Sequence, residues 1–445
     1  MSRDNPRPVR SGSVPRLIVL FCLLAVAGVR ADSLPAESVK LKTLPNGLRV
    51  LVREAHEAPL VTIDLWLRAG SARETPETNG VAHFMEHLLF RGTAKRATGE
   101  IDRTIEELGA TLNATTSRDW MHLYATVASR YWQNALEVMA DAIQNSALRP
   151  EDIDVEQAVI LGELARAADD PIRDANQRLA ELIFQKHSYR LPVAATPESI
   201  MHIRREQIVQ FYRKYYVPSN ASLVIVGDVT APEAFAAAQK LFGDWQRREI
   251  TDPPPPLDSP PDSPRKAEFK VRRGVPVVGI GFRAPSVKEV VDVCACDLLL
   301  ALLGQREGLL TRLLVGQGVA TRVTTEFLTQ RDPGVFSIVI ELPEKGSPSQ
   351  VEAMVVGALQ QLAKTPVPEA ELVRAKREIL GNYLFSMETT EGQASTLGFY
   401  EMIDTYLFAT EYEKNVQAVK PEDIRRVVER YLNPERRAVV YLLPQ

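Results

Sequence analysis

The pattern of apolar and polar positions in the first half of the chain predicts strands and helices in separate runs. Residues 61–65 alternate between apolar and polar side chains, as expected of a half-buried strand. Residues 41–52 form a predicted hairpin, because Asn46-Gly47 suits a tight turn between two strands. Elements that do not follow a strict β-α-β order predict an α+β domain. Further strands are predicted at 122–128 and 223–226, and helices at 131–145 and 151–167.

A proline-rich segment divides the chain. Residues 252–264 contain seven prolines in 13 positions, and neither a helix nor a central strand accommodates such a run. We therefore predict a linker at 252–264 between a first domain, 32–251, and a second domain, 265–445. The similar lengths of the two domains suggest an internal repeat.

Ordered identities relate the two domains. Five residues of 206–224 recur in 422–440 at a constant offset of 216, within a helix-then-strand pattern in both places. Two shorter matches upstream, in 150–162 and 368–381, keep the same order. We therefore predict an α+β domain that is present twice. The recurring residues are Glu206, Ile208, Tyr215, Pro218 and Val224, which return as Glu422, Ile424, Tyr431, Pro434 and Val440.

The N-terminus has the pattern of an export signal. Several arginines precede an apolar run at 17–29, and Val29-Arg30-Ala31 fits a small-x-small cleavage site. A run of 13 residues is short for a membrane span, which needs about 20, so a retained anchor is the weaker alternative. We predict a cleaved signal peptide at 1–31 and a periplasmic protein, with secretion as the alternative.

Composition narrows the function classes. Hydrophobic residues make up 45% and charged residues 25% of the chain, which is typical of a soluble globular protein. The net charge is −4, and residues 1–31 hold five Arg and one Asp, so the remainder is more acidic than the whole. Nucleic acid is therefore an unsuitable partner. Cys294 and Cys296 point in different directions on a predicted helix, so no disulfide is expected.

The segment 79–92 carries the pattern H-x-x-E-H on a predicted helix. His83 and His87 are four residues apart and share a helix face, so both imidazoles can bind one metal ion. Glu86 borders that face and can reach a water on the metal, which is the position of a general base. The pattern is that of a zinc peptidase. The alternative is two helix histidines without a metal.

A catalytic zinc site needs a third protein ligand from elsewhere in the chain. The predicted helix 151–167 offers Glu156 and Glu163, which are seven residues apart on one face. Gly162 would let that helix approach another closely. Solvated acids on an acidic helix are the alternative, and spacing alone does not decide between the two.

These residues, together with Leu112-Asn113-Ala114-Thr115 and 218–228, make the chain resemble the pitrilysin and insulinase metallopeptidases, which include the mitochondrial processing peptidases. The resemblance implies two duplicated α+β domains facing each other across a chamber, and one Zn²⁺ per chain. It also implies that Glu163 is the third ligand and that Glu156 orients the ligands and supports water activation. Asn113 and Ala114 match the edge strand that binds an extended peptide substrate.

The second domain departs from the family pattern. It has no H-x-x-E-H, and Asn382 stands at the repeat position of Glu163. Active members usually have an Arg and a Tyr there that contact the substrate carbonyl. The matching stretch, 311–321, is four residues shorter, lacks the turn that bears this Arg, and has Thr321 in place of the Tyr. Arg322 is a local substitute, although it faces the other side of a strand from Thr321.

The sequence therefore supports a zinc endopeptidase that hydrolyses extended or unfolded peptides. The missing Arg and Tyr predict a homologous partner subunit that supplies them in a heterodimer, with a homodimer as the alternative. The competing interpretation is a non-catalytic assembly or peptide-binding subunit of the same fold. A purely structural zinc site is disfavoured, because three ligands with an adjacent Glu leave a coordination position open.

Overall fold

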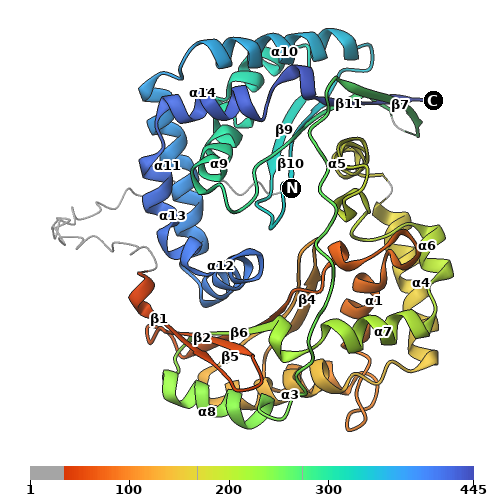
Figure 1. The fold of residues 1–445 in the computed structure, drawn as a ribbon, viewed down its shortest axis with the longest axis vertical. Coiled ribbons are helices and arrows are strands. Elements are labelled where there is room, and N and C mark those ends of the chain that lie inside the picture. Colours follow the sequence, from red (N-terminus) through yellow and green to blue (C-terminus); the bar gives the residue numbers. More distant parts are fainter. Residues whose placement is uncertain (1–34, 168, 273) are drawn as a thin grey trace, which may run out of the picture. The chain divides into compact units, whose positions relative to one another are not determined.

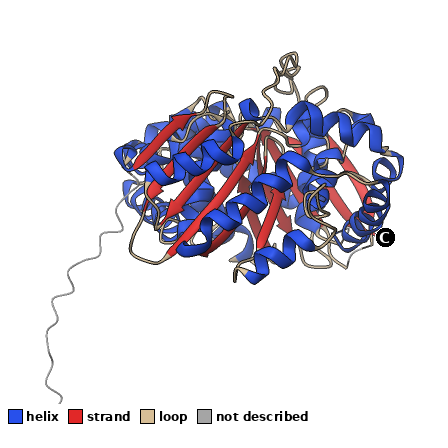
Figure 2. Cartoon of the chain, turned by 90° about the horizontal axis from the view of Figure 1, so that it is seen from below, coloured by secondary structure: helices blue, strands red, loops and turns tan. Residues whose placement is uncertain are grey.

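The computed structural model describes residues 35–167, 169–272 and 274–445, which fold around two β-sheets (Figure 1). The predicted signal peptide lies outside the described residues. The first sheet has six strands and the second has five, and Figure 2 shows these strands packed against helices. None of the helices in the described residues is long and apolar enough to span a bilayer.

The first sheet confirms the strands that the alternation predicted. Its strands, in spatial order, are β1 (Val39–Thr43), β2 (Arg49–Glu54), β6 (Ala221–Gly227), β3 (Leu60–Leu67), β5 (Met121–Ala128) and β4 (Leu112–Thr116). The helices of this half are α1 (Val81–Leu88), α2 (Glu100–Glu107), α3 (Trp132–Asn145), α4 (Pro150–Ala167), α5 (Pro171–Ile183), α6 (Pro197–His202), α7 (Arg205–Tyr215) and α8 (Ala231–Phe242).

The second sheet repeats this topology. Its spatial order is β7 (Arg265–Val271), β11 (Ala438–Pro444), β8 (Val277–Arg283), β10 (Val335–Glu341) and β9 (Arg322–Phe327). β2 runs parallel to β6 in the first sheet, as β7 runs parallel to β11 in the second, and the other neighbours are antiparallel. β1 is an additional edge strand of the first sheet. The predicted duplication of an α+β domain is confirmed. The helices are α9 (Val290–Gly304), α10 (Pro348–Lys364), α11 (Glu369–Ser386), α12 (Thr390–Ile403), α13 (Leu407–Ala418) and α14 (Pro421–Arg430).

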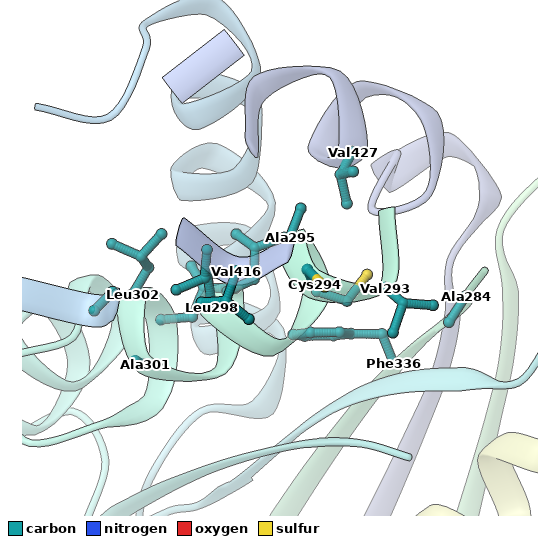
Figure 3. Packing of buried hydrophobic residues seen from close by; sticks show 14 of the residues in the cluster. Ala284, Val293, Cys294, Ala295, Leu298, Ala301, Leu302, Phe336, Val416 and Val427 are labelled. Atoms are coloured by element: carbon teal, nitrogen blue, oxygen red, sulfur yellow. The ribbon is translucent and has the colours of Figure 1, made fainter. Parts of the chain in front are cut away.

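The core of the second half surrounds α9, an apolar helix that is buried over most of its length. Figure 3 shows Cys294 and Leu298 of α9 among residues of β10, α13 and α14, including Phe336, Val416 and Val427. Cys294 and Cys296 are both buried and free, so they pack as small apolar side chains.

Each half of the chain covers the sheet of the other half with one helix. Helix α5 packs on β8, β10 and β11, whereas α12 packs on β3 and β6 (Figure 1). Gly398 allows the α12 contact, because a Cβ atom there would lie 2.0 Å from Nε1 of Trp66. Arg68 Nε donates to the Met402 carbonyl at 3.0 Å, and the Thr62 and Thr390 hydroxyls are 2.8 Å apart. We call this arrangement the helix exchange.

The expectation for Gly162 was wrong. A Cβ atom at this position would meet only the side chain of Arg166, at 3.7 Å, so no other helix approaches α4 there.

The segment 252–264 contains no helix or strand, and acidic side chains attach it to the first half of the chain. Asp258 accepts backbone hydrogen bonds from Gln185, Lys186 and His187.

Candidate metal centre

The helix that carries H-x-x-E-H starts at a buried carboxylate. Glu74 accepts hydrogen bonds from the Asn79 side chain at 2.9 Å, from Gly80 N at 3.0 Å and from Ala82 N at 2.7 Å. The Gly80 and Ala82 N–H groups are backbone donors that the start of α1 leaves unpaired. Gly80 has φ +109°, and a Cβ atom there would also lie 2.6 Å from that of Ala195. Burial raises the pKa of Glu74 to about 7, although these N–H donors oppose the shift.

The structure brings the three predicted zinc ligands together. His83 and His87 lie on α1, and Glu163 lies on the neighbouring α4. The Nε2 atoms of the two histidines are 3.3 Å apart. Oε2 of Glu163 is 3.7 Å from Nε2 of His83 and 3.6 Å from Nε2 of His87. Two imidazole nitrogens and one carboxylate oxygen are the donor set of a catalytic zinc ion, so the residues fit this metal.

Glu156 orients one of these ligands. Its Oε2 is 2.8 Å from Nδ1 of His87, which fixes Nε2 as the atom that faces His83 and Glu163. Oε1 of the same carboxylate accepts from Arg91 Nε. Burial lowers the pKa of His87, but the hydrogen bond to Glu156 and the charges of Glu156, Glu163 and Glu86 together outweigh it, so the net shift is upward. For Glu156, burial raises the pKa, but the hydrogen bonds and charges of His87 and Arg91 outweigh this, so the net shift of its pKa is downward.

Glu86 lies beside the three candidate ligands without joining them. Burial raises the pKa of its carboxyl group, while nearby Thr116 and His87 lower it. Glu86 shares a cavity of about 350 Å³ with Glu156 and Glu163. A carboxylate with a raised pKa at the edge of this cavity is suited to accept a proton from a water molecule.

The predicted substrate residues lie on the edge of the first sheet. Asn113 and Ala114 belong to β4, which pairs only with β5 among the described strands. Asn113 is exposed and Ala114 is half-buried. The outer edge of β4 therefore has free backbone groups that an extended peptide can pair with.

The second half has no comparable ligand set among the described residues. Arg322, the predicted substitute donor, is 62% exposed at its side chain and lies 3.6 Å from Glu341. Thr321 hydrogen-bonds the Glu341 carbonyl, and Arg312 lies 3.5 Å from Glu371.

The sequence interpretation missed Glu74 and Arg91. Both act through the elements that carry the ligands: Glu74 caps α1, and Arg91 holds Glu156. An acid shortly before a helix start was the available signal for Glu74, since carboxylates favour helix N-termini.

Fold and site together define a metallopeptidase, with H-x-x-E-H on one helix and a carboxylate from a second helix. The chain belongs to the insulinase family of peptidases, M16. The family description "Insulinase (Peptidase family M16)" matches residues 49–197, and "Peptidase M16 inactive domain" matches 202–379.

Relatives agree with this assignment. Zinc protease PqqE of Helicobacter pylori is 26% identical, over 97% of this chain and 99% of that protein. A probable mitochondrial-processing peptidase subunit beta of Arabidopsis thaliana is 26% identical, over 90% of this chain and 77% of that protein. The crystal structure of a protease from H. pylori shares the fold with a TM-score of 0.87 at 24% identity, covering 91% of this chain and 99% of that one.

Replacing Glu156 tests the orientation of His87. In Glu156→Gln, the carboxylate that pairs with both His87 and Arg91 is lost, while the side chain keeps its shape. We expect zinc affinity to fall by about 10- to 100-fold. Competition with a chelator measures this affinity. The exposed Glu151→Gln on the same helix is the control, and equal affinities in the two variants would contradict the role of Glu156.

Proposed function

We propose that the protein is a zinc-dependent endopeptidase that hydrolyses extended or unfolded peptides. The observation that carries this proposal is the convergence of His83, His87 and Glu163, with Glu86 at the same cavity. When bound, a zinc ion supplies Lewis-acid activation of water and of a peptide carbonyl. Glu86 accepts the proton of the attacking water and passes it to the leaving amine.

The residues around this centre have distinct tasks. β4 pairs with the backbone of the peptide and holds it extended beside α1, which contacts this strand. Glu156 fixes the ring of His87, and Glu74 fixes the start of α1. We further propose export by a cleaved signal peptide and residence in the periplasm, on the N-terminal sequence pattern alone.

The missing oxyanion donors support a second chain of the same fold as part of the enzyme. Removing one donor typically costs about 10²- to 10³-fold in rate, so a site without two is weak. Arg322 and Arg312 lie near acids of their own half. Arg173 is the local alternative: it is exposed on α5 and forms no ion pair within the described residues. Burial and the charge of His87 lower the pKa of His83, and the charge of Arg173 adds to this shift.

The partner experiment compares the isolated chain with the chain mixed with a homologue that retains the Arg and Tyr. We expect weak cleavage of an unstructured peptide by the isolated chain and at least about a tenfold gain on mixing. Strong activity of the isolated chain, undiminished in Arg322→Ala and in Arg173→Ala, would contradict both the partner and a local donor.

A non-catalytic role is the second candidate. The stretch 311–321 lacks the Arg-bearing turn and the Tyr that contact the substrate carbonyl in active family members, and this favours a non-catalytic role. A mixture that binds peptides but cleaves none, with zinc fully bound, would support this role instead.

A further inference from the structure

A second cavity lies at the place in the second half that corresponds to the metal centre. It has a volume of about 430 Å³ and includes Asn382, the repeat counterpart of Glu163. Both halves contribute to its wall, because α12 of the helix exchange packs against β3. No Lys or Arg is among its lining residues. The wall is mainly aromatic, with Trp66, Trp120, Phe327, Tyr383, Phe399 and Tyr412.

One acid, Asp297 on α9, lines this aromatic cavity. Its Oδ2 accepts a hydrogen bond of 2.7 Å from the Tyr412 hydroxyl, and the described residues give the carboxylate no cationic partner. Burial raises the pKa of Asp297 to about 7, with the Tyr412 hydrogen bond opposing the shift. A carboxylate held among aromatic rings without a cation is costly, and a ligand that brings a positive charge removes that cost.

Another part of the wall is built from a hydrogen-bonded pair and stacked rings. Nδ1 of His122 is 2.8 Å from Oδ1 of the buried Asp64. The His122 ring stacks on Trp66 at 4.0 Å between centroids, and Trp120 meets Trp66 edge to face at 4.9 Å. The stacked pair is buried and holds Trp120, which is only half-buried, in a fixed position where its ring is available to a cation.

We propose that this cavity binds the ammonium or guanidinium group of a lysine or arginine side chain in a peptide substrate. The aromatic walls and the single unpaired acid are complementary to an organic cation. An uncharged aromatic or aliphatic side chain would leave the carboxylate without a cationic partner. The proposal rests on the proposed peptidase function, and it assigns to the second half a recognition task at the position where the first half has metal ligands.

The edge strand connects this cavity to the peptide. Thr115 on β4 pairs with His122 on β5, and His122 pairs with Trp66 on β3, so these three side chains lie on one face of the first sheet. A peptide added to β4 presents every second side chain on that face. A long basic side chain at such a position lies on the same side of the sheet as the aromatic wall.

The test uses internally quenched peptides that carry arginine, or its uncharged analogue citrulline, at one position at a time. For the zinc-loaded wild-type protein, with its partner if one is required, we expect kcat/KM to favour arginine by about tenfold at one position. Asp297→Asn keeps an acceptor for Tyr412 and removes the charge. We expect it to lose the preference for arginine over citrulline.

A second variant guards against misfolding of the first. Asn382→Lys adds an ammonium group to the wall of the same cavity. We expect this tethered cation to pair with Asp297, to raise the Tm, and to abolish the preference for arginine. A lower Tm together with an unchanged preference would overturn the proposal.

Peptide binding separates this proposal from the peptidase function. Fluorescence anisotropy of labelled arginine and citrulline peptides is measured with wild-type and Asp297→Asn protein. Tighter binding of the arginine peptide that depends on Asp297 supports the cavity even if neither peptide is cleaved. A preference for arginine that survives in Asp297→Asn, or a preference for an uncharged side chain, overturns the proposal while the peptidase function stands.

Discussion

Replacing Glu163 by alanine is expected to remove zinc from the protein and to abolish peptide cleavage. Glu163 is the only carboxylate in the candidate ligand set. Its Oε2 lies 3.6 Å from Nε2 of His87 and 3.7 Å from Nε2 of His83. Two histidines alone leave a zinc ion with too few protein ligands for a stable site. Replacing either histidine by alanine should have the same effect. Metal analysis of the purified protein, with about one zinc per wild-type chain, checks this result.

An acid on the same helix provides the matched control for Glu163. Asp154 is exposed on α4 and forms no ion pair with the other described residues. Asp154→Ala should keep zinc and activity. Full zinc occupancy in Glu163→Ala would show that this carboxylate, which is 39% exposed at its side chain, is a surface acid rather than a ligand.

The second large effect is expected for Glu86→Gln. An amide cannot accept the proton of the attacking water, and loss of a general base typically lowers the rate by about 10²- to 10⁴-fold. Because Glu86 lies outside the candidate ligand set, zinc content should remain that of the wild type. Steady-state cleavage of an unstructured peptide and metal analysis of the same preparation measure the two quantities together.

The outcome of Glu86→Gln distinguishes three roles. Retained zinc with lost cleavage identifies the general base. Zinc lost together with activity would make Glu86 a ligand. Unchanged cleavage would remove it from the mechanism, and Glu107→Gln on the exposed side of α2 controls for a general effect of neutralising an acid in this region.

The candidate centre was predictable to different degrees for its different residues. The period of the helix alone places His83 and His87 on one face. Spacing did not separate Glu163 from a solvated acid, because its side chain is in fact partly exposed, and only the family resemblance selected it. Glu74 escaped prediction because its partners are backbone N–H groups brought close by the turn before α1, for which side-chain patterns give no direct signal.

The duplicated topology followed from the internal repeat, but the helix exchange did not. An amphipathic pattern shows that a helix such as α5 has an apolar face, and it does not say which sheet that face covers. The choice depends on contacts between residues far apart in the chain, such as Arg68 with Met402.

The helix exchange has the form of a domain swap within one polypeptide. If each half were a separate chain, α5 and α12 would be the elements exchanged between two protomers. Neither protomer could then cover its own sheet without the helix of the other. The segment 252–264 turns that bimolecular association into an intramolecular one with a high effective concentration. Separation of the two halves by cleavage within 252–264 would therefore make their association depend on protein concentration.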